Sequence, residues 1–122
     1  MRNEKEVIKL IENNLDPLEI KEKRKQNISV SFAPDKAIQA LSFLKSNSYK
    51  HLSTISCVDW IDDNEFELVY HVFSYEDYIN ISVKTRIDRE KARFMTLKEI
   101  WPVAEFYERD IHDFFGVEFE GN

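Results

Sequence analysis

The stretch Glu65–Ile87, EFELVYHVFSYEDYINISVKTRI, decides the fold, because it reads as two long strands joined by a short polar turn. Successive side chains of a strand point to opposite faces. In 65–74 this places Phe66, Leu68, Tyr70 and Val72 on one face and Val69, His71 and Phe73 on the other. Both faces are fairly apolar, so we expect this strand to be central in a sheet.

The neighbouring segments also alternate. In 78–87, Ile79, Ile81, Val83 and Ile87 would face inward, and Asn80, Ser82, Lys84 and Arg86 outward. The turn between the two strands is Tyr75-Glu76-Asp77. A further strand over about 50–60 carries Leu52, Ile55, Cys57 and Val58, and Asp62-Asp63-Asn64 forms the turn after it.

The N-terminal third predicts a helix, a hairpin and a second helix. Apolar residues at helical spacing indicate an amphipathic helix over about 4–14, which Asp16-Pro17 ends. The segment 18–32 reads as a hairpin whose charged first arm suits a sheet edge. Pro34-Asp35 opens the second helix, and Asn47 is its C-terminal stop.

The last third predicts one more helix. Thr96 is placed to cap a short helical turn leading to Trp101, and Pro102 lies early in a helix that ends at Phe115 and Gly116. The predicted order is α-β-β-α-β-β-β-α. The sequence therefore predicts one α+β domain over 1–122, with two layers and helices packed on a mixed sheet.

Composition narrows the functions that the chain can have. The formal net charge of -6 disfavours nucleic acid and anionic membrane surfaces as partners. The two glycines, Gly116 and Gly121, cannot form a phosphate-binding loop, and one cysteine cannot hold an iron–sulfur cluster or a cysteine zinc site. We expect no transmembrane helix, no signal peptide and no internal disulfide, consistent with a reducing cytoplasm.

A helical wheel of the last helix marks Asp110 as an anomaly. Val103, Phe106, Tyr107, Asp110, Ile111 and Phe114 share one broad side, and Glu105, Glu108, Arg109 and His112 share the other. A carboxylate within an apolar side is costly unless it is hydrogen-bonded or paired. Asp110 is thus either a rim residue or a buried polar contact, and the other side is a solvated or partner-facing surface.

Metal binding and catalysis have weaker support. Glu105, Glu108 and His112 could converge on one metal ion, but one helix supplies all three candidates. His51, His71 and Asp59 could suggest acid–base chemistry, yet their spacing matches no motif, and Cys57 reads as a small core residue. We consider the large aromatic residues of the chain as possible anchors for a partner. Most of them should lie in the core, while a subset could contact a partner. The residues considered are Trp60, Trp101, Tyr107, Phe114 and Phe115.

The C-terminal residues resemble the signature of the 30-kDa subunit family of respiratory complex I, the C subunit of NADH dehydrogenase, and of related membrane-bound hydrogenases. The resemblance covers roughly 50–121, and Leu52-Ser53, Val58-Asp59 and 67–71 resemble the family's strand region. The ending at Asn122 is most similar to the short subunits of energy-converting nickel–iron hydrogenases. The signature residues are Trp101, Pro102, Ala104, Phe106, Tyr107, Glu108, Arg109, Asp110, Asp113, Phe115, Gly116, Val117, Phe119 and Gly121.

The resemblance implies a cofactor-free subunit of a peripheral arm, without chemistry of its own. Its partners would be the large catalytic subunit and a small iron–sulfur subunit, which would hold the nickel–iron centre and the iron–sulfur clusters. The hetero-oligomer would sit on the cytoplasmic face of the membrane and couple electron transfer to ion pumping. From the signature, Glu108, Arg109, Asp110 and Asp113 are expected to be structural or interface residues.

Two other functions stay open at this point. The chain could be a stand-alone binding or adaptor module on the same fold. It could also be a small enzyme that uses His71 or His112 with nearby carboxylates.

Overall fold

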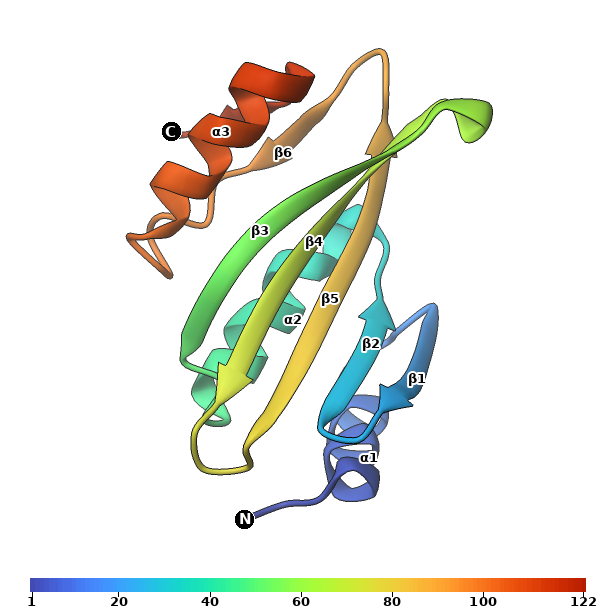
Figure 1. Ribbon diagram of the computed structural model, residues 1–122, viewed down its shortest axis with the longest axis vertical. Helices are drawn as coiled ribbons and strands as arrows, with labels where there is room; N and C mark the ends of the chain where they lie inside the picture. Colours follow the sequence, from blue (N-terminus) through green and yellow to red (C-terminus); the bar gives the residue numbers. More distant parts are fainter.

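The computed structural model describes all residues 1–122 and contains a twisted five-stranded sheet with helices on one side (Figure 1). The predicted α+β class and element order are confirmed, with small additions. The helices are α1 (Glu4–Asn14), α2 (Pro34–Ser46), α3 (Ala104–Phe115) and the single turn η1 (Ile61–Asp63). The strands are β1 (Glu19–Arg24), β2 (Asn27–Ser31), β3 (His51–Trp60), β4 (Glu65–Ser74), β5 (Ile79–Asp88), β6 (Arg93–Met95) and β7 (Glu118–Glu120).

The sheet is mixed, as predicted, with the strand order β1-β2-β5-β4-β3. Three pairs are antiparallel, and the pairing of β2 with β5 is parallel, with Val30 beside Val83. The strand expected to be central, β4, is an interior strand with partners on both sides, although β5 takes the middle place. The charged β1 lies at an edge, as its composition predicts.

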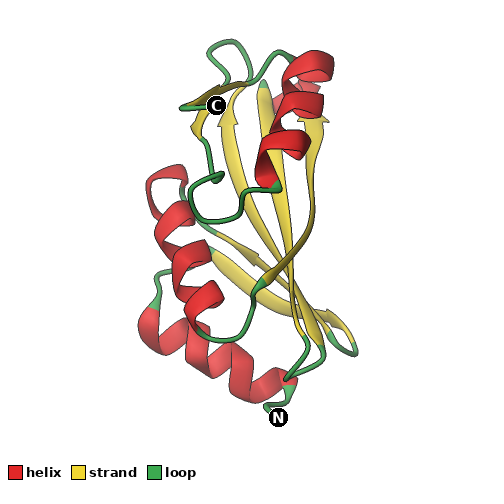
Figure 2. Ribbon diagram, turned by 90° about the vertical axis from the view of Figure 1, so that its left-hand side faces the viewer, coloured by secondary structure: helices red, strands yellow, loops and turns green.

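The predicted alternation along β4 and β5 separates a covered face from an open face. Leu68, Tyr70, Val72, Ile81 and Val83 are fully buried in one continuous core. α1 and α2 lie behind the sheet in Figure 1, and the edge-on view in Figure 2 places both on one side of it. The opposite face, which carries the outward residues of β5, has no helix over it.

Local signals set the ends of the first two helices. Asn3 forms a capping box with Glu6, in which each side chain accepts a hydrogen bond from the other residue's backbone N–H. Pro34 occupies the first turn of α2, where its missing N–H costs nothing, and Asn47 ends that helix as predicted.

The C-terminal third holds two strands that the sequence did not predict. β6 and β7 have three residues each and pair in parallel, with Phe94 beside Phe119. Thr96 caps the turn after β6 as expected, because its Oγ1 accepts a hydrogen bond from the Lys98 N–H at 3.2 Å. The regular part of α3 begins at Ala104 rather than at Pro102. α3 lies along edge strand β3 and contacts β7 (Figure 1).

Candidate docking surface on the C-terminal helix

The side chain of Glu108 fastens the inner face of α3 to the rest of the domain. It is fully buried, and its carboxylate accepts hydrogen bonds from the Thr96 hydroxyl, from the Leu97 N–H at 2.8 Å and from the Asn122 Nδ2 at 3.1 Å. Thr96 and Leu97 precede the helix, whereas Asn122 follows it. Glu108 therefore joins both flanking segments of α3 in one polar contact.

This geometry corrects the helical-wheel interpretation. Asp110 is exposed, which agrees with the rim interpretation and not with a buried contact, whereas Glu108, expected on the solvated side, is buried. The inner face is formed by Ala104, Glu108 and Ile111. The wheel fails because it equates apolar with inward, and three aromatics of this helix are exposed.

Other signature residues also hold α3 in place. The Trp101 Nε1 donates a hydrogen bond to the Lys50 carbonyl at 2.8 Å, and the Tyr107 hydroxyl donates to the Ser53 carbonyl at 2.8 Å. The Phe115 ring meets the Phe66 ring edge-on, with 5.6 Å between centroids. Gly116 ends the helix at φ 77°, a left-handed conformation that glycine adopts without a Cβ penalty.

Four exposed signature residues and two exposed neighbours form what we call the outer face of α3, which includes the turn just before the helix. Its members are Pro102, Val103, Phe106, Asp110, Asp113 and Phe114. Phe114 is 87% exposed and Phe106 is 61% exposed, which is unusual for such apolar side chains. Neither Asp110 nor Asp113 makes an ion pair or a side-chain hydrogen bond. Arg109 is also exposed, but Glu105 lies 3.6 Å from it.

Phe114 is the most exposed of the apolar residues that the wheel placed on the inward side. Phe114 and Phe115 are adjacent, so a helix turns them about 100° apart and cannot point both at one core. The doubled aromatic was the signal in the sequence that one of them faces outward. Exposed aromatic side chains that lie together are typical of a protein-binding surface.

The structure does not assemble the residues considered for metal binding. No group of three or more His, Cys, Asp or Glu side chains is placed to hold a metal ion. The Glu108 carboxylate is occupied by its three donors, and the His112 Nδ1 lies 2.9 Å from the Val117 carbonyl. The geometry of α3 thus gives the metal hypothesis no support.

The candidate acid–base residues are separated as well. His51 packs beside Tyr75, the His71 Nδ1 hydrogen-bonds with the Ser82 hydroxyl at 3.1 Å, and Asp59 pairs with Arg89 at 2.8 Å. Burial raises the pKa of the Cys57 thiol to about 11, and the nearby Asp59 contributes to that rise, so the thiol stays protonated near neutral pH. None of these groups forms the nucleophile–base–orienter set that catalysis needs.

Comparison with known proteins agrees with the resemblance read from the sequence. Residues 30–122 match the family described as "Respiratory-chain NADH dehydrogenase, 30 Kd subunit". The C subunit of the NADH-quinone oxidoreductase of Moorella thermoacetica is 32% identical over 89 residues, which cover 72% of this chain and 60% of that protein. The chain spans a little over half the length of the first curated relatives it matches.

Two solved structures resemble the fold. A chain from the archaeal membrane-bound sulfane sulfur reductase, a respiratory membrane complex, superposes with a TM-score of 0.88 and 41% identity, covering 98% of this chain and 71% of that one. The trypsin-resistant fragment of Nqo5 superposes with a TM-score of 0.74 at 23% identity, covering 84% of this chain and 86% of the fragment, which shows a shared fold alone. None of the helices here has the length and apolar character that a membrane span requires.

Proposed function

Because this chain belongs to the respiratory-chain NADH dehydrogenase 30 Kd subunit family, we propose that it is a non-catalytic subunit of a membrane-bound, ion-pumping respiratory complex. It docks on the large catalytic subunit and stabilises it during electron transfer. The observation that carries the proposal is the family match over residues 30–122. The 41% identity to a chain of an archaeal respiratory membrane complex supports it further.

The partners supply the redox chemistry in this proposal. They are a large subunit and a small iron–sulfur subunit, which hold the iron–sulfur clusters and, in the hydrogenase branch, a nickel–iron centre. This chain stays peripheral, on the cytoplasmic face, and contributes contacts rather than reacting groups.

The outer face of α3 is the docking surface that we assign to the large subunit. Phe106 and Phe114 would enter apolar pockets of that partner, because exposed aromatics are enriched among residues that dominate binding energy. Asp110 and Asp113 have no partner within the chain, so basic side chains at the rim of those pockets would complement them. The inner face of the same helix supports this surface from below through Glu108.

Affinity purification of tagged protein from gently solubilised native membranes tests the subunit assignment. We expect recovery of a large subunit with iron–sulfur subunits. Mass spectrometry with metal analysis then identifies which class of respiratory complex the chain belongs to. Nickel with iron would identify a hydrogenase, and iron without nickel a quinone- or sulfur-reducing relative. Recovery of the chain alone would overturn the proposal and favour an adaptor module.

Variants of the outer face test the docking surface. Phe106→Ser with Phe114→Ser, and separately Asp110→Arg, should reduce recovery of the large subunit at least tenfold, without changing the fold of the isolated chain. Tyr75→Ser is the matched control, because Tyr75 is 72% exposed at the turn between β4 and β5, away from α3. Equal recovery with the α3 variants and the control would show that another surface docks.

A further inference from the structure

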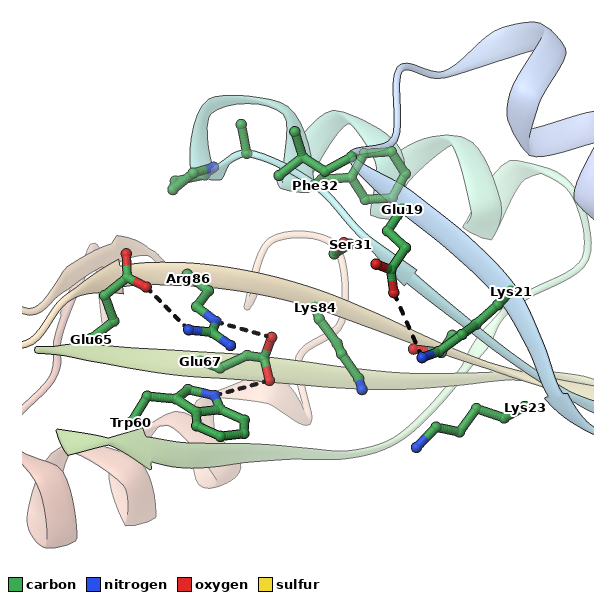
Figure 3. Close-up of a pocket in the computed structure, with 14 residues that line it drawn as sticks. Glu19, Lys21, Lys23, Ser31, Phe32, Trp60, Glu65, Glu67, Lys84 and Arg86 are labelled. Atoms are coloured by element: carbon green, nitrogen blue, oxygen red, sulfur yellow. Dashed lines mark hydrogen bonds and ion pairs between the residues drawn. The ribbon is translucent and has the colours of Figure 1, made fainter. Parts of the chain in front are cut away.

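The open face of the five-stranded sheet carries a trough whose two ends differ in charge (Figure 3). Two adjoining hollows share Lys23, Ser29, Trp60, Glu67 and Lys84, so together they run across the strands from β1 to β3. Hydroxyl and amide side chains line much of the floor between these ends. This surface lies on the face of the sheet that no helix covers.

At the end of the trough near β3, carboxylates of the chain itself neutralise the Arg86 cation. The Arg86 guanidinium bonds Asp63 at 2.9 Å and Glu65 at 3.2 Å, and Glu67 lies 3.6 Å from its Nε. Arg86 also stacks over the Trp60 ring, 4.6 Å from the ring centroid, and the Trp60 Nε1 donates to Glu67 at 3.3 Å. Three carboxylates thus surround one arginine, which leaves this end acidic.

The end near β1 has the opposite balance. Lys23 and Lys84 make no ion pair, and Lys21 has only the neighbouring Glu19 at 3.6 Å. Lys84 is half-buried and has no ion-pair partner, although the chain contains 23 Asp and Glu residues. His71, whose pKa is lowered by burial and by the Lys84 charge, adds no positive charge of its own near neutral pH.

A lysine that makes no ion pair within its own chain is available to a carboxylate of a partner. Lys23 and Lys84 stay unpaired in a protein whose net charge is -6, where pairing would be easy to arrange. We propose that the basic end of the trough, Lys21, Lys23 and Lys84, binds an extended acidic segment of a partner subunit.

The dimensions and the charge order fit an extended segment. Five strands about 4.8 Å apart span about 19 Å, which about six extended residues would cross. Carboxylates of the segment would meet the three lysines, and a neutral or apolar residue would lie against Trp60, which is 40% exposed. The carboxylates around Arg86 repel an acidic residue at that end, so they fix the direction of the segment.

This inference rests on the chain's being a subunit, but it uses a different surface from the outer face of α3. The test is carbodiimide cross-linking of the purified complex, because this reagent joins an amine only to a carboxylate in direct contact. We expect mass spectrometry to find Lys23 or Lys84 joined to an Asp or Glu of a partner subunit. Charge reversal by Lys23→Glu with Lys84→Glu should lower recovery of that subunit at least tenfold at low salt.

The control is Lys9→Glu, since Lys9 is exposed on α1 and likewise makes no ion pair. If the complex forms but Lys23 and Lys84 react with a water-soluble acetylating reagent as fast as in the isolated chain, the trough is a free surface and the inference is overturned. That result would leave the subunit assignment intact. A complex whose trough lysines are protected by bound lipid, with no cross-linked partner, would also overturn it.

Discussion

Glu108 and Lys84 are both ionisable residues with buried or half-buried side chains, but the chain treats them differently. Glu108 is fully buried and receives hydrogen bonds from three groups of its own chain. Lys84 is half-buried on the open face of the sheet and receives no carboxylate. The comparison teaches that a charge whose partners all lie inside the chain holds the fold, whereas Lys84 is left free for the partner contact that we propose.

The largest effect should come from breaking the Glu108 contact. Glu108→Ala leaves the buried Thr96 hydroxyl and Leu97 N–H without an acceptor, and buried unsatisfied groups cost about 1–3 kcal/mol each. We expect a loss of about 3 kcal/mol in the free energy of unfolding, measured by urea titration. Asp110→Ala, two residues away and exposed, is the control, and a loss of similar size there would contradict the assignment of inner and outer faces.

The glycines after α3 should give the next effects, because they position the segment that brings Asn122 to Glu108. Gly116 has φ 77° and no atom within 4 Å of the point that a Cβ would occupy, so Gly116→Ala should cost about 1 kcal/mol from backbone strain alone. Gly121 has φ 95°, and a Cβ there would lie 2.8 Å from the Thr96 methyl group. Gly121→Ala should therefore destabilise more than Gly116→Ala in the same titration, and the reverse order would refute this account.

Removing the charge of Lys84 should barely change the isolated chain. Lys84→Gln abolishes an ammonium that has no internal partner, so the free energy of unfolding should move by no more than about 0.5 kcal/mol. Calorimetry on the isolated chain measures this shift. A loss approaching that of Glu108→Ala would mean that Lys84 has a structural role, and the contrast between the two charges would fail.

The smallest effect on stability should come from His71, whose pKa is influenced by the nearby Lys84 charge. Its pKa in the folded chain is lowered by burial and by Lys84, whereas an unfolded histidine titrates near about 6.5. The unfolded state thus binds more protons between these two values, so stability falls as the pH drops below about 6.5. His71→Gln should lose less stability than the wild type between neutral and mildly acidic pH.

An NMR titration separates the two causes of that shift. Lys84→Gln should raise the pKa of His71, because the like charge beside it is gone. His51 and His112, which do not face Lys84, serve as references in the same spectra. An unchanged His71 titration would show that burial alone sets its pKa.

Sequence reasoning predicted the sheet better than the site. The alternation of β4 and β5 and the end signals Pro34 and Asn47 identified most elements, because they depend on neighbouring residues. The strands β6 and β7 escaped notice, since three residues are too few to show alternation and their pairing joins distant segments. The donors that let Glu108 be buried lie 11 to 14 residues away, beyond the reach of a helical wheel.

The parallel pairing of β2 with β5 has a consequence for the order of folding. The strands β3, β4 and β5 follow one another and can pair as they are synthesised. The hairpin of β1 and β2 must wait for β5, because α2, β3, η1 and β4 lie between them in the sequence. Lys21 and Lys23 come from that hairpin and Lys84 from β5, so the three cations meet only after this long-range pairing has formed. A partner that contacts all three lysines would bind only chains in which β2 has already paired with β5, so its binding would distinguish folded from partly folded chains.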